Sequence, residues 1–238
     1  MTRIELPEQN PRRLAFFLAM EEWVARNLPP EEYFFTWSVM PTVIIGHNQD
    51  IYSEVNLEYC RENGIEVVRR RSGGGCVFAD GDNIMMSYIC PETNVEETFR
   101  HYTQMVANQL QKMGFLAEPS GRNDITIGGR KISGNAFYLL KDRSIIHGTM
   151  LYDTNIQHML NAITPSRAKL ESHQVKSVEA RIIMASRIKP EMSFKQFHDD
   201  LTAGLETKKR TLTDAEIKSI EEIEQKYYSH DWLYLGKN

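Results

Sequence analysis

Apolar residues follow two kinds of spacing along the chain, and each kind predicts a different element. Between residues 12 and 27 they recur every three or four positions, which predicts a helix. Later apolar runs are short and rich in aromatic or β-branched residues, as is typical of strands. These runs cover residues 33–37, 42–46, 65–68, 76–78 and 84–89, and the polar sequence at 80–83 predicts a turn between the last two.

A longer helix and two more strands are predicted next. Thr93 and Glu96 have the spacing of a capping box. The helical pattern that follows has an apolar face, and Gly114 ends it. That face consists of Phe99, Tyr102, Val106, Leu110 and Met113. Strands are predicted around residues 123–127 and 143–151, with the glycine-bracketed segment 128–138 between them.

The last third of the chain predicts mainly helices. An apolar stripe runs over residues 194–205, and Thr213 with Glu216 forms a second capping box before an apolar pattern that reaches Tyr227. Strands gathered first, with helices around them, indicate an α/β fold of the α+β type, with a mixed, largely antiparallel sheet flanked by helices. No repeat or Gly/Ser linker divides the chain, so we expect one domain over residues 1–238 with a helical C-terminal part.

Composition narrows the class of protein. The chain has 238 residues, 41% of them hydrophobic and 25% charged, and a formal net charge of −4. This balance is ordinary for a soluble globular protein and argues against a general nucleic-acid binder, which is usually basic. No signal peptide or 18-residue apolar run is present, and Cys60, Cys76 and Cys90 form no CxxC pair. We therefore expect a cytoplasmic protein without a membrane segment, a disulfide framework or a zinc site.

The segment Arg71-Ser72-Gly73-Gly74-Gly75 is the first candidate for chemistry. Consecutive glycines let backbone N–H groups approach a phosphate, and a guanidinium can form paired hydrogen bonds with its oxygens. The loop is neither a Walker A loop, because no Gly-Lys-Ser/Thr follows, nor a dinucleotide fingerprint, because a strand comes next. Taken alone, the segment is equally compatible with a flexible hairpin and solvated arginines.

Three further polar positions could act on a phosphate. Lys131 lies between glycines, and its ammonium could neutralise charge where a carboxylate meets a phosphate. Asp124, after Asn123, could hold Mg²⁺. His147 lies before Gly148 in a predicted strand. Each also has a plain structural interpretation: a surface turn for the lysine, an Asx turn for the aspartate and a packed core residue for the histidine.

Cys76 is a candidate nucleophile only if a base is near it. It falls in an apolar strand pattern with no histidine close in sequence, so the pattern favours a buried, inert thiol.

The order and separation of these segments resemble the lipoate–protein ligase family. The likeness runs from about residue 12 to the C-terminus and is densest between residues 41 and 152. It rests on Pro41 to Gly46 with Gln49, Arg69–Gly75, Asn123-Asp124, Gly129–Ala136 and His147-Gly148-Thr149. The resemblance implies an α/β domain related to biotin–protein ligase and the class II aminoacyl-tRNA synthetases. One departure is Phe78-Ala79-Asp80, where the family usually ends a related pattern in His-Asp.

The resemblance also implies roles for residues. Lys131 would contact the lipoyl carbonyl and the phosphate, and Asp124 would hold Mg²⁺. The implied nucleotide and acyl contacts are Arg71, Ser72, Gly73, Gly74, Gly75, Cys76, Val77, Phe78, Asn123, Asp124, Gly134, Asn135, Ala136 and His147. An apolar slot for the lipoyl tail would be walled by Trp37, Val43, Val77 and Met150.

The implied activity is ATP-dependent lipoylation. Lipoate would attack the α-phosphate of ATP, and a lysine of the acceptor would then attack the lipoyl-adenylate. Implied acceptors are apo lipoyl domains of 2-oxoacid dehydrogenases and the glycine cleavage H protein. Many members carry a small accessory domain after the catalytic one. This chain ends shortly after Trp232, where that domain would begin, so a separate accessory protein is a possible partner.

Four interpretations stay open at this point. The first is a complete ligase. The second is a lipoyl or octanoyl transferase that uses a preformed acyl-adenylate or an acylated carrier. Its thiol-dependent version is disfavoured because no cysteine lies between Glu92 and Asn238. The third is a biotin–protein ligase, whose expected Gly-Arg-Gly-Arg loop does not match. The fourth is a binding module without activity.

Overall fold

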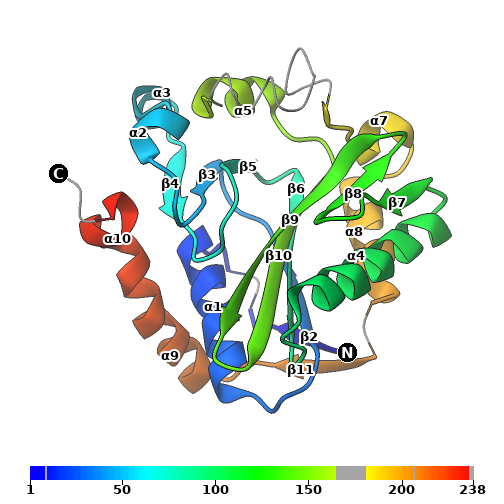
Figure 1. The fold of residues 1–238 in the computed structure, drawn as a ribbon, viewed down its shortest axis with the longest axis horizontal. Helices are drawn as coiled ribbons and strands as arrows, with labels where there is room; N and C mark the ends of the chain where they lie inside the picture. The colour runs from blue at the N-terminus through cyan, green and yellow to red at the C-terminus, as the bar shows by residue number, and fades with distance from the viewer. Residues whose placement is uncertain (9, 165–180, 206, 236–238) are drawn as a thin grey trace.

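The strands form two sheets of unequal size (Figure 1). The structure is a computed structural model and describes residues 1–8, 10–164, 181–205 and 207–235. The larger sheet has the order β11-β1-β2-β6-β10-β9-β8-β7. Its strands are β1 (Thr2–Glu5), β2 (Tyr33–Trp37), β6 (Asn83–Cys90), β7 (Ala117–Pro119), β8 (Asp124–Ile127), β9 (Arg130–Leu140), β10 (Arg143–Leu151) and β11 (Lys208–Thr211).

The smaller sheet has the order β4-β3-β5, with strands β3 (Thr42–Ile45), β4 (Glu66–Arg69) and β5 (Val77–Ala79). β3 runs parallel to β4 and antiparallel to β5. In the larger sheet β1 pairs in parallel with β2 and β11, and every other neighbouring pair is antiparallel. The predicted mixed, largely antiparallel fold is therefore confirmed.

Helices pack against both sheets (Figure 1). The longer ones are α1 (Leu14–Asn27), α4 (Val95–Lys112), α8 (Phe194–Ala203) and α9 (Asp214–Glu224). The shorter ones are α2 (Ile51–Glu54), α3 (Leu57–Glu62), α5 (Ile156–Ala162), α7 (Ala185–Ile188), α10 (His230–Tyr234) and the 3₁₀ turn η2 (Gln225–Tyr228). Among the helices of the described residues, none combines the length and the apolar character needed to cross a membrane.

Three apolar clusters separate the layers. α1 packs between the larger sheet and α9, and every residue from Leu14 to Ala25 is buried. The opposite face of that sheet packs on α4 and α8, and the outer face of the smaller sheet packs on α2, α3 and α5. The inner face of the smaller sheet, with Ile44 and Val68, joins the α1 cluster. The space between the two sheets is where their inner side chains face one another.

Most predicted elements are found within one or two residues of their predicted bounds. The strands β1, β7 and β11 were not predicted, because they are short and have few apolar residues. The segment 128–138 is not a loop but contains most of β9, an 11-residue strand. The predicted cap at Thr93 is wrong: Asn94 caps α4, since its side chain accepts a hydrogen bond from the N–H of Glu97 at 3.1 Å. The capping box of Thr213 and Glu216 is confirmed.

Candidate active site

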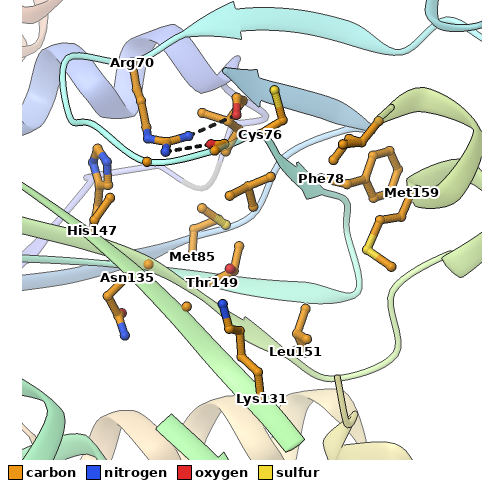
Figure 2. Close-up of a pocket in the computed structure, with 18 of the residues that line it drawn as sticks. Arg70, Cys76, Phe78, Met85, Lys131, Asn135, His147, Thr149, Leu151 and Met159 are labelled. Atoms are coloured by element: carbon orange, nitrogen blue, oxygen red, sulfur yellow. Dashed lines mark hydrogen bonds between the residues drawn. The ribbon is translucent and has the colours of Figure 1, made fainter. Parts of the chain in front are cut away.

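A cavity of about 410 Å³ lies between the two sheets. Figure 2 shows Arg70 and Cys76 on one side of it and Lys131 on the other. The loop before β5 supplies Gly74 and Gly75, and β9 supplies Lys131, Gly134 and Ala136. The volume is within the range of small-molecule sites. The glycine loop and Lys131 therefore face one cavity, as the sequence predicted.

Arg70 lines this cavity, as Arg181 does, and it also holds the glycine loop. Its guanidinium donates hydrogen bonds to the carbonyl oxygens of Ile44 (3.0 Å), Gly73 (2.7 Å) and Gly75 (2.8 Å). Its Nε donates to Ser72 Oγ at 2.8 Å. Burial lowers the pKa of Arg70 to about 10, so the group stays charged near neutral pH. The loop carbonyls thus turn toward Arg70.

Arg71, the predicted phosphate contact, does not line the cavity. Its Nε donates to Glu22 Oε1 at 2.9 Å, and its guanidinium lies 5.6 Å from the ring centre of Trp232. Burial lowers the pKa of Arg71, but Glu22, Tyr227 and Tyr138 together raise it more, so the net shift in the pKa is upward. The structure therefore places Arg71 against α1 and the C-terminal helices.

A buried hydrogen-bonded chain joins the glycine loop to α1. Ser72 Oγ lies 2.6 Å from His147 Nε2, and His147 Nδ1 lies 2.9 Å from Glu21 Oε2. The same carboxylate accepts from the Ser87 hydroxyl (2.6 Å) and the Tyr138 hydroxyl (3.3 Å). Glu21 accepts from Nδ1–H if His147 is neutral with its proton on Nδ1, and Nε2 then accepts from Ser72. His147 lines the cavity as predicted, whereas Ser72 is fully buried behind it.

A bulge in the sheet aims Lys131 at the cavity. Opposite Ile125 and Thr126 the pairing steps from Ser133 to Lys131, which leaves Ile132 as the extra residue. Gly134 and Ala136 line the cavity, and side chains of a regular strand alternate between its two faces. Without the bulge, position 132 would therefore also face the cavity. Ile132 is instead fully buried among the side chains under α4. A single backbone irregularity thus decides which side chain of β9 faces the cavity.

Lys131 and Asp124 form an ion pair at the cavity wall. The Lys131 Nζ lies 2.8 Å from Asp124 Oδ2, and both side chains are partly exposed. A Cβ built on Gly134 would lie 3.4 Å from Lys131 Nζ and 3.6 Å from Asp124 Oδ1, in ordinary contact or slightly closer. The absence of a side chain at Gly134 therefore leaves room beside the ammonium.

Asn123 and Asn135 lock the neighbouring strand ends together. The Asn123 amide donates to the carbonyl oxygen of Asn135 at 2.6 Å, and the Asn135 amide donates to that of Asn123 at 2.7 Å. Both residues line the cavity. These contacts hold the wall next to Lys131 through side chains as well as through the sheet.

The apolar part of the cavity differs in two positions from the predicted slot. Trp37 and Val77 line it as expected, but Val43 and Met150 point to the opposite faces of their strands and are fully buried. Their chain neighbours Ile44 and Leu151 take their places in the wall. Because strand side chains alternate, an error of one residue reverses the face. The other large apolar side chains of the lining are Leu18, Phe78, Met85, Met159, Leu160, Ile163 and Ile182.

Cys76 is not buried as predicted. It is partly exposed and lines the cavity, one residue before β5, whereas Cys60 and Cys90 are buried. Gly75, Val77 and Phe78, which the resemblance implied as contacts together with Cys76, line the cavity beside it.

Sequence reasoning missed Glu21, Arg70 and Gly46. Two adjacent glutamates in an otherwise apolar helix were a usable signal for Glu21, because acids are rarely fully buried without partners. A Cβ on Gly46 would overlap the carbonyl oxygen of Gly74. Gly46 therefore permits the close approach of the glycine loop to the end of β3. Nothing in residue spacing alone distinguishes Arg70 from Arg71.

Comparisons with known proteins agree with this geometry. The chain belongs to the lipoyl protein ligase A/B catalytic domain family, whose sequence model matches residues 13–206. It is similar to lipoate-protein ligase LplJ of Bacillus subtilis (strain 168), with 36% identity over 228 residues, covering 91% of this chain and 69% of that protein. Lipoate–protein ligase 1 of Staphylococcus aureus (strain Mu50) is also 36% identical, with 93% and 70% covered.

A solved structure has the same fold. It is the bi-partite lipoate protein ligase of Thermoplasma acidophilum, studied with its E2 lipoyl domain. The two chains superpose with a TM-score of 0.86 at 25% sequence identity, covering 100% of this chain and 98% of the other. The predicted family and its α/β fold are therefore confirmed.

Proposed function

We propose that this chain is an ATP-dependent lipoate–protein ligase that forms lipoyl-adenylate and transfers the lipoyl group to an acceptor lysine. One observation carries the proposal: an apolar slot and a polar wall with Lys131 are parts of the same cavity. The apolar part suits the lipoyl chain, and the ammonium suits the carboxylate and phosphate that meet at its end.

In the first step a lipoate carboxylate oxygen attacks the α-phosphorus of ATP. The bond from that phosphorus to the bridging oxygen breaks, and pyrophosphate leaves with the electron pair. Both reactants are anionic, so the Lys131 ammonium lowers their repulsion. The N–H groups of Gly74 and Cys76 are suited to the same charge. Arg70 binds the carbonyl oxygens of Gly73 and Gly75, and in a trans peptide unit the following N–H points the opposite way.

In the second step the neutral amine of an acceptor lysine attacks the acyl carbonyl carbon. The bond from that carbon to the phosphate oxygen breaks, AMP leaves with the electron pair, and the amine nitrogen releases a proton to water. Lys131 would stabilise charge on the carbonyl oxygen in this step also. The expected acceptors are apo lipoyl domains of 2-oxoacid dehydrogenases and the glycine cleavage H protein. The E2 lipoyl domain studied with the Thermoplasma ligase supports this choice.

Asp124 is suited to a magnesium ion at this site. Its Oδ2 pairs with Lys131, while its Oδ1 is buried without a hydrogen-bond partner among the described residues. Elsewhere in the described part of the chain, no three His, Cys, Asp or Glu side chains gather as a metal site. One carboxylate oxygen is enough, because Mg²⁺ bound with a nucleotide takes its other ligands from phosphates and water. Bound there, the ion would neutralise phosphate charge.

A second candidate keeps only the transfer step. If an accessory protein is needed to form the adenylate, this chain alone would act as a transferase from lipoyl-adenylate. The bi-partite organisation of the Thermoplasma ligase favours keeping this alternative.

The deciding experiment incubates the purified chain with ATP, Mg²⁺, lipoate and an apo lipoyl domain. Mass spectrometry should find one lipoyl group added to the acceptor. Synthetic lipoyl-adenylate replaces ATP and lipoate in a parallel reaction. Product only from the adenylate would indicate the transferase, and no product from either donor at any enzyme concentration would reject both candidates.

A further inference from the structure

A second groove, of about 560 Å³, lies beside the active-site cavity. One wall is formed by α4 and the other by the turn before β8 together with β9. We call it the lateral groove. It shares four lining residues with the cavity: Gly74, Asn123, Asn135 and Ala136. The two spaces therefore adjoin each other at these four residues.

The shared wall lies next to the proposed reaction centre. Asn135 follows Gly134, whose open side faces Lys131 Nζ, and Asn123 precedes Asp124, which is paired with that same ammonium. The groove thus approaches the cavity beside Lys131. The apolar residues Trp37 and Met159 line the cavity but not the lateral groove.

The proposed reaction needs a third path into the site. Lipoyl-adenylate has an acyl arm and a nucleotide arm, and both occupy the cavity. The acceptor amine must reach the carbonyl carbon, which is the point where these arms join. The lateral groove adjoins the cavity beside that point.

The lateral groove also has suitable chemistry for a lysine side chain. Phe99 and Phe137 line it, with ring centres 5.7 Å apart, and offer apolar contact to a four-carbon stem. Arg100 and Arg122 line it as well and are exposed, and they outnumber Glu96, the acidic residue of the lining. Their charge favours the neutral form of an incoming amine, which is its nucleophilic form. It also attracts an acidic protein surface.

We propose that the lateral groove admits the acceptor lysine and docks a protein surface with acidic residues around that lysine. This inference rests on the lipoyl transfer proposed above. It assigns to Arg100 and the exposed face of α4 a role in acceptor recognition rather than in adenylate binding.

The test compares variants of α4 in lipoyl transfer to an apo lipoyl domain, with synthetic lipoyl-adenylate as donor. Arg100→Glu should raise the KM for the acceptor about 10-fold, because it places a negative charge in the groove. Gln104→Trp should lower kcat/KM for the acceptor about 10-fold by narrowing the groove. The affinity for lipoyl-adenylate, measured by calorimetry, should change less than about twofold in both.

Two exposed positions provide matched controls. Arg61 pairs with Glu58 three residues earlier on α3, as Arg100 does with Glu97, so Arg61→Glu makes the same charge reversal outside the groove. Asn108 lies one turn after Gln104 on α4 and does not line the groove, so Asn108→Trp controls for bulk. Both controls should transfer lipoate at the wild-type rate.

Two results would overturn the inference in an active enzyme. One is an unchanged acceptor KM in Arg100→Glu. The other is an equal loss of adenylate affinity, which would make the groove part of the nucleotide site. A wild-type chain that transfers nothing would instead remove the ligase proposal, and this inference with it.

Discussion

The two walls of the cavity are held in different ways. The glycine loop is irregular backbone, and buried side chains support it: Arg70 binds its carbonyl oxygens, and Ser72 is joined through His147 to Glu21. The opposite wall, β9, is paired along its length with β8 and β10. Lys131 reaches out from that ladder and has Asp124 as its ion-pair partner.

Because of this difference, we expect substitutions in the two walls to affect different properties, namely the free energy of unfolding for the loop supports and the activity for Lys131. A side chain that supports the loop is buried and hydrogen-bonded, so its loss leaves unsatisfied groups and costs free energy of unfolding. A side chain that projects from a complete ladder can be removed while the backbone stays in place. We therefore expect the β9 wall to carry the reaction and the loop wall to depend on its buried supports.

The largest effect on activity is expected from Lys131→Ala. The change removes the ammonium from the β9 wall and should lower kcat/KM for lipoyl transfer by about 10²–10³-fold, the usual cost of one preorganised donor. The free energy of unfolding should stay within about 0.5 kcal/mol of wild type, because the side chain is partly exposed. Steady-state kinetics and urea unfolding measure the two quantities.

Lys131→Gln is the matched variant, since it keeps a donor but not the charge. It should lie between wild type and Lys131→Ala in activity. Unchanged lipoylation in Lys131→Ala would show that Lys131 takes no part in the reaction. The proposal that the β9 wall carries the reaction would then be wrong.

The next effect is expected where the loop approaches β3. In Gly46→Ala the added Cβ would overlap the carbonyl oxygen of Gly74 and displace the loop. A displacement of about 1 Å can cost up to about 10²-fold, and we expect kcat/KM for lipoate to fall at least about 10-fold. Gly81→Ala, in the turn before β6, is the control, because a Cβ there meets no atom within 4 Å. Equal activity of the two variants would contradict the close approach.

A smaller effect on activity, with a clear loss of stability, is expected from Glu21→Gln. The carboxylate accepts from His147, Ser87 and Tyr138, and a glutamine has only one oxygen to replace its two. The amide nitrogen that replaces the other oxygen is itself a hydrogen-bond donor, so it cannot accept from these groups. We expect a loss of about 1–3 kcal/mol in the free energy of unfolding and a several-fold higher KM for lipoate. Glu97→Gln, at an exposed position on α4, should change neither.

A loss of activity in Glu21→Gln without a loss of stability would break the proposed division between the walls. It would mean that Glu21 acts on bound lipoate rather than through the loop. Urea unfolding and lipoate kinetics of the same preparation distinguish the two outcomes.

The two walls were also predictable to different degrees. The resemblance to lipoate–protein ligases placed the glycine loop and Lys131 in one site, whereas residue types and spacing alone left each of them with a plain structural interpretation as well. The supports were not visible: Glu21 is 51 residues from Ser72, and only the packing of α1 under the sheet brings them together. The bulge at Ile132 and the face of Val43 depend on which strand pairs with which, and local pattern carries no record of that.

The smallest effect is expected from Cys76→Ser, which tests whether the loop wall acts through side chains or backbone. The thiol is partly exposed and lines the cavity, so burial does not protect it from reaction. In the proposed mechanism Cys76 contributes its backbone N–H group, which a serine at this position also has. Cys76→Ser should therefore keep lipoyl transfer within about twofold of wild type. A covalent lipoyl thioester on Cys76, seen by mass spectrometry of the quenched enzyme, together with a large loss of activity in Cys76→Ser, would establish the thiol-dependent route instead.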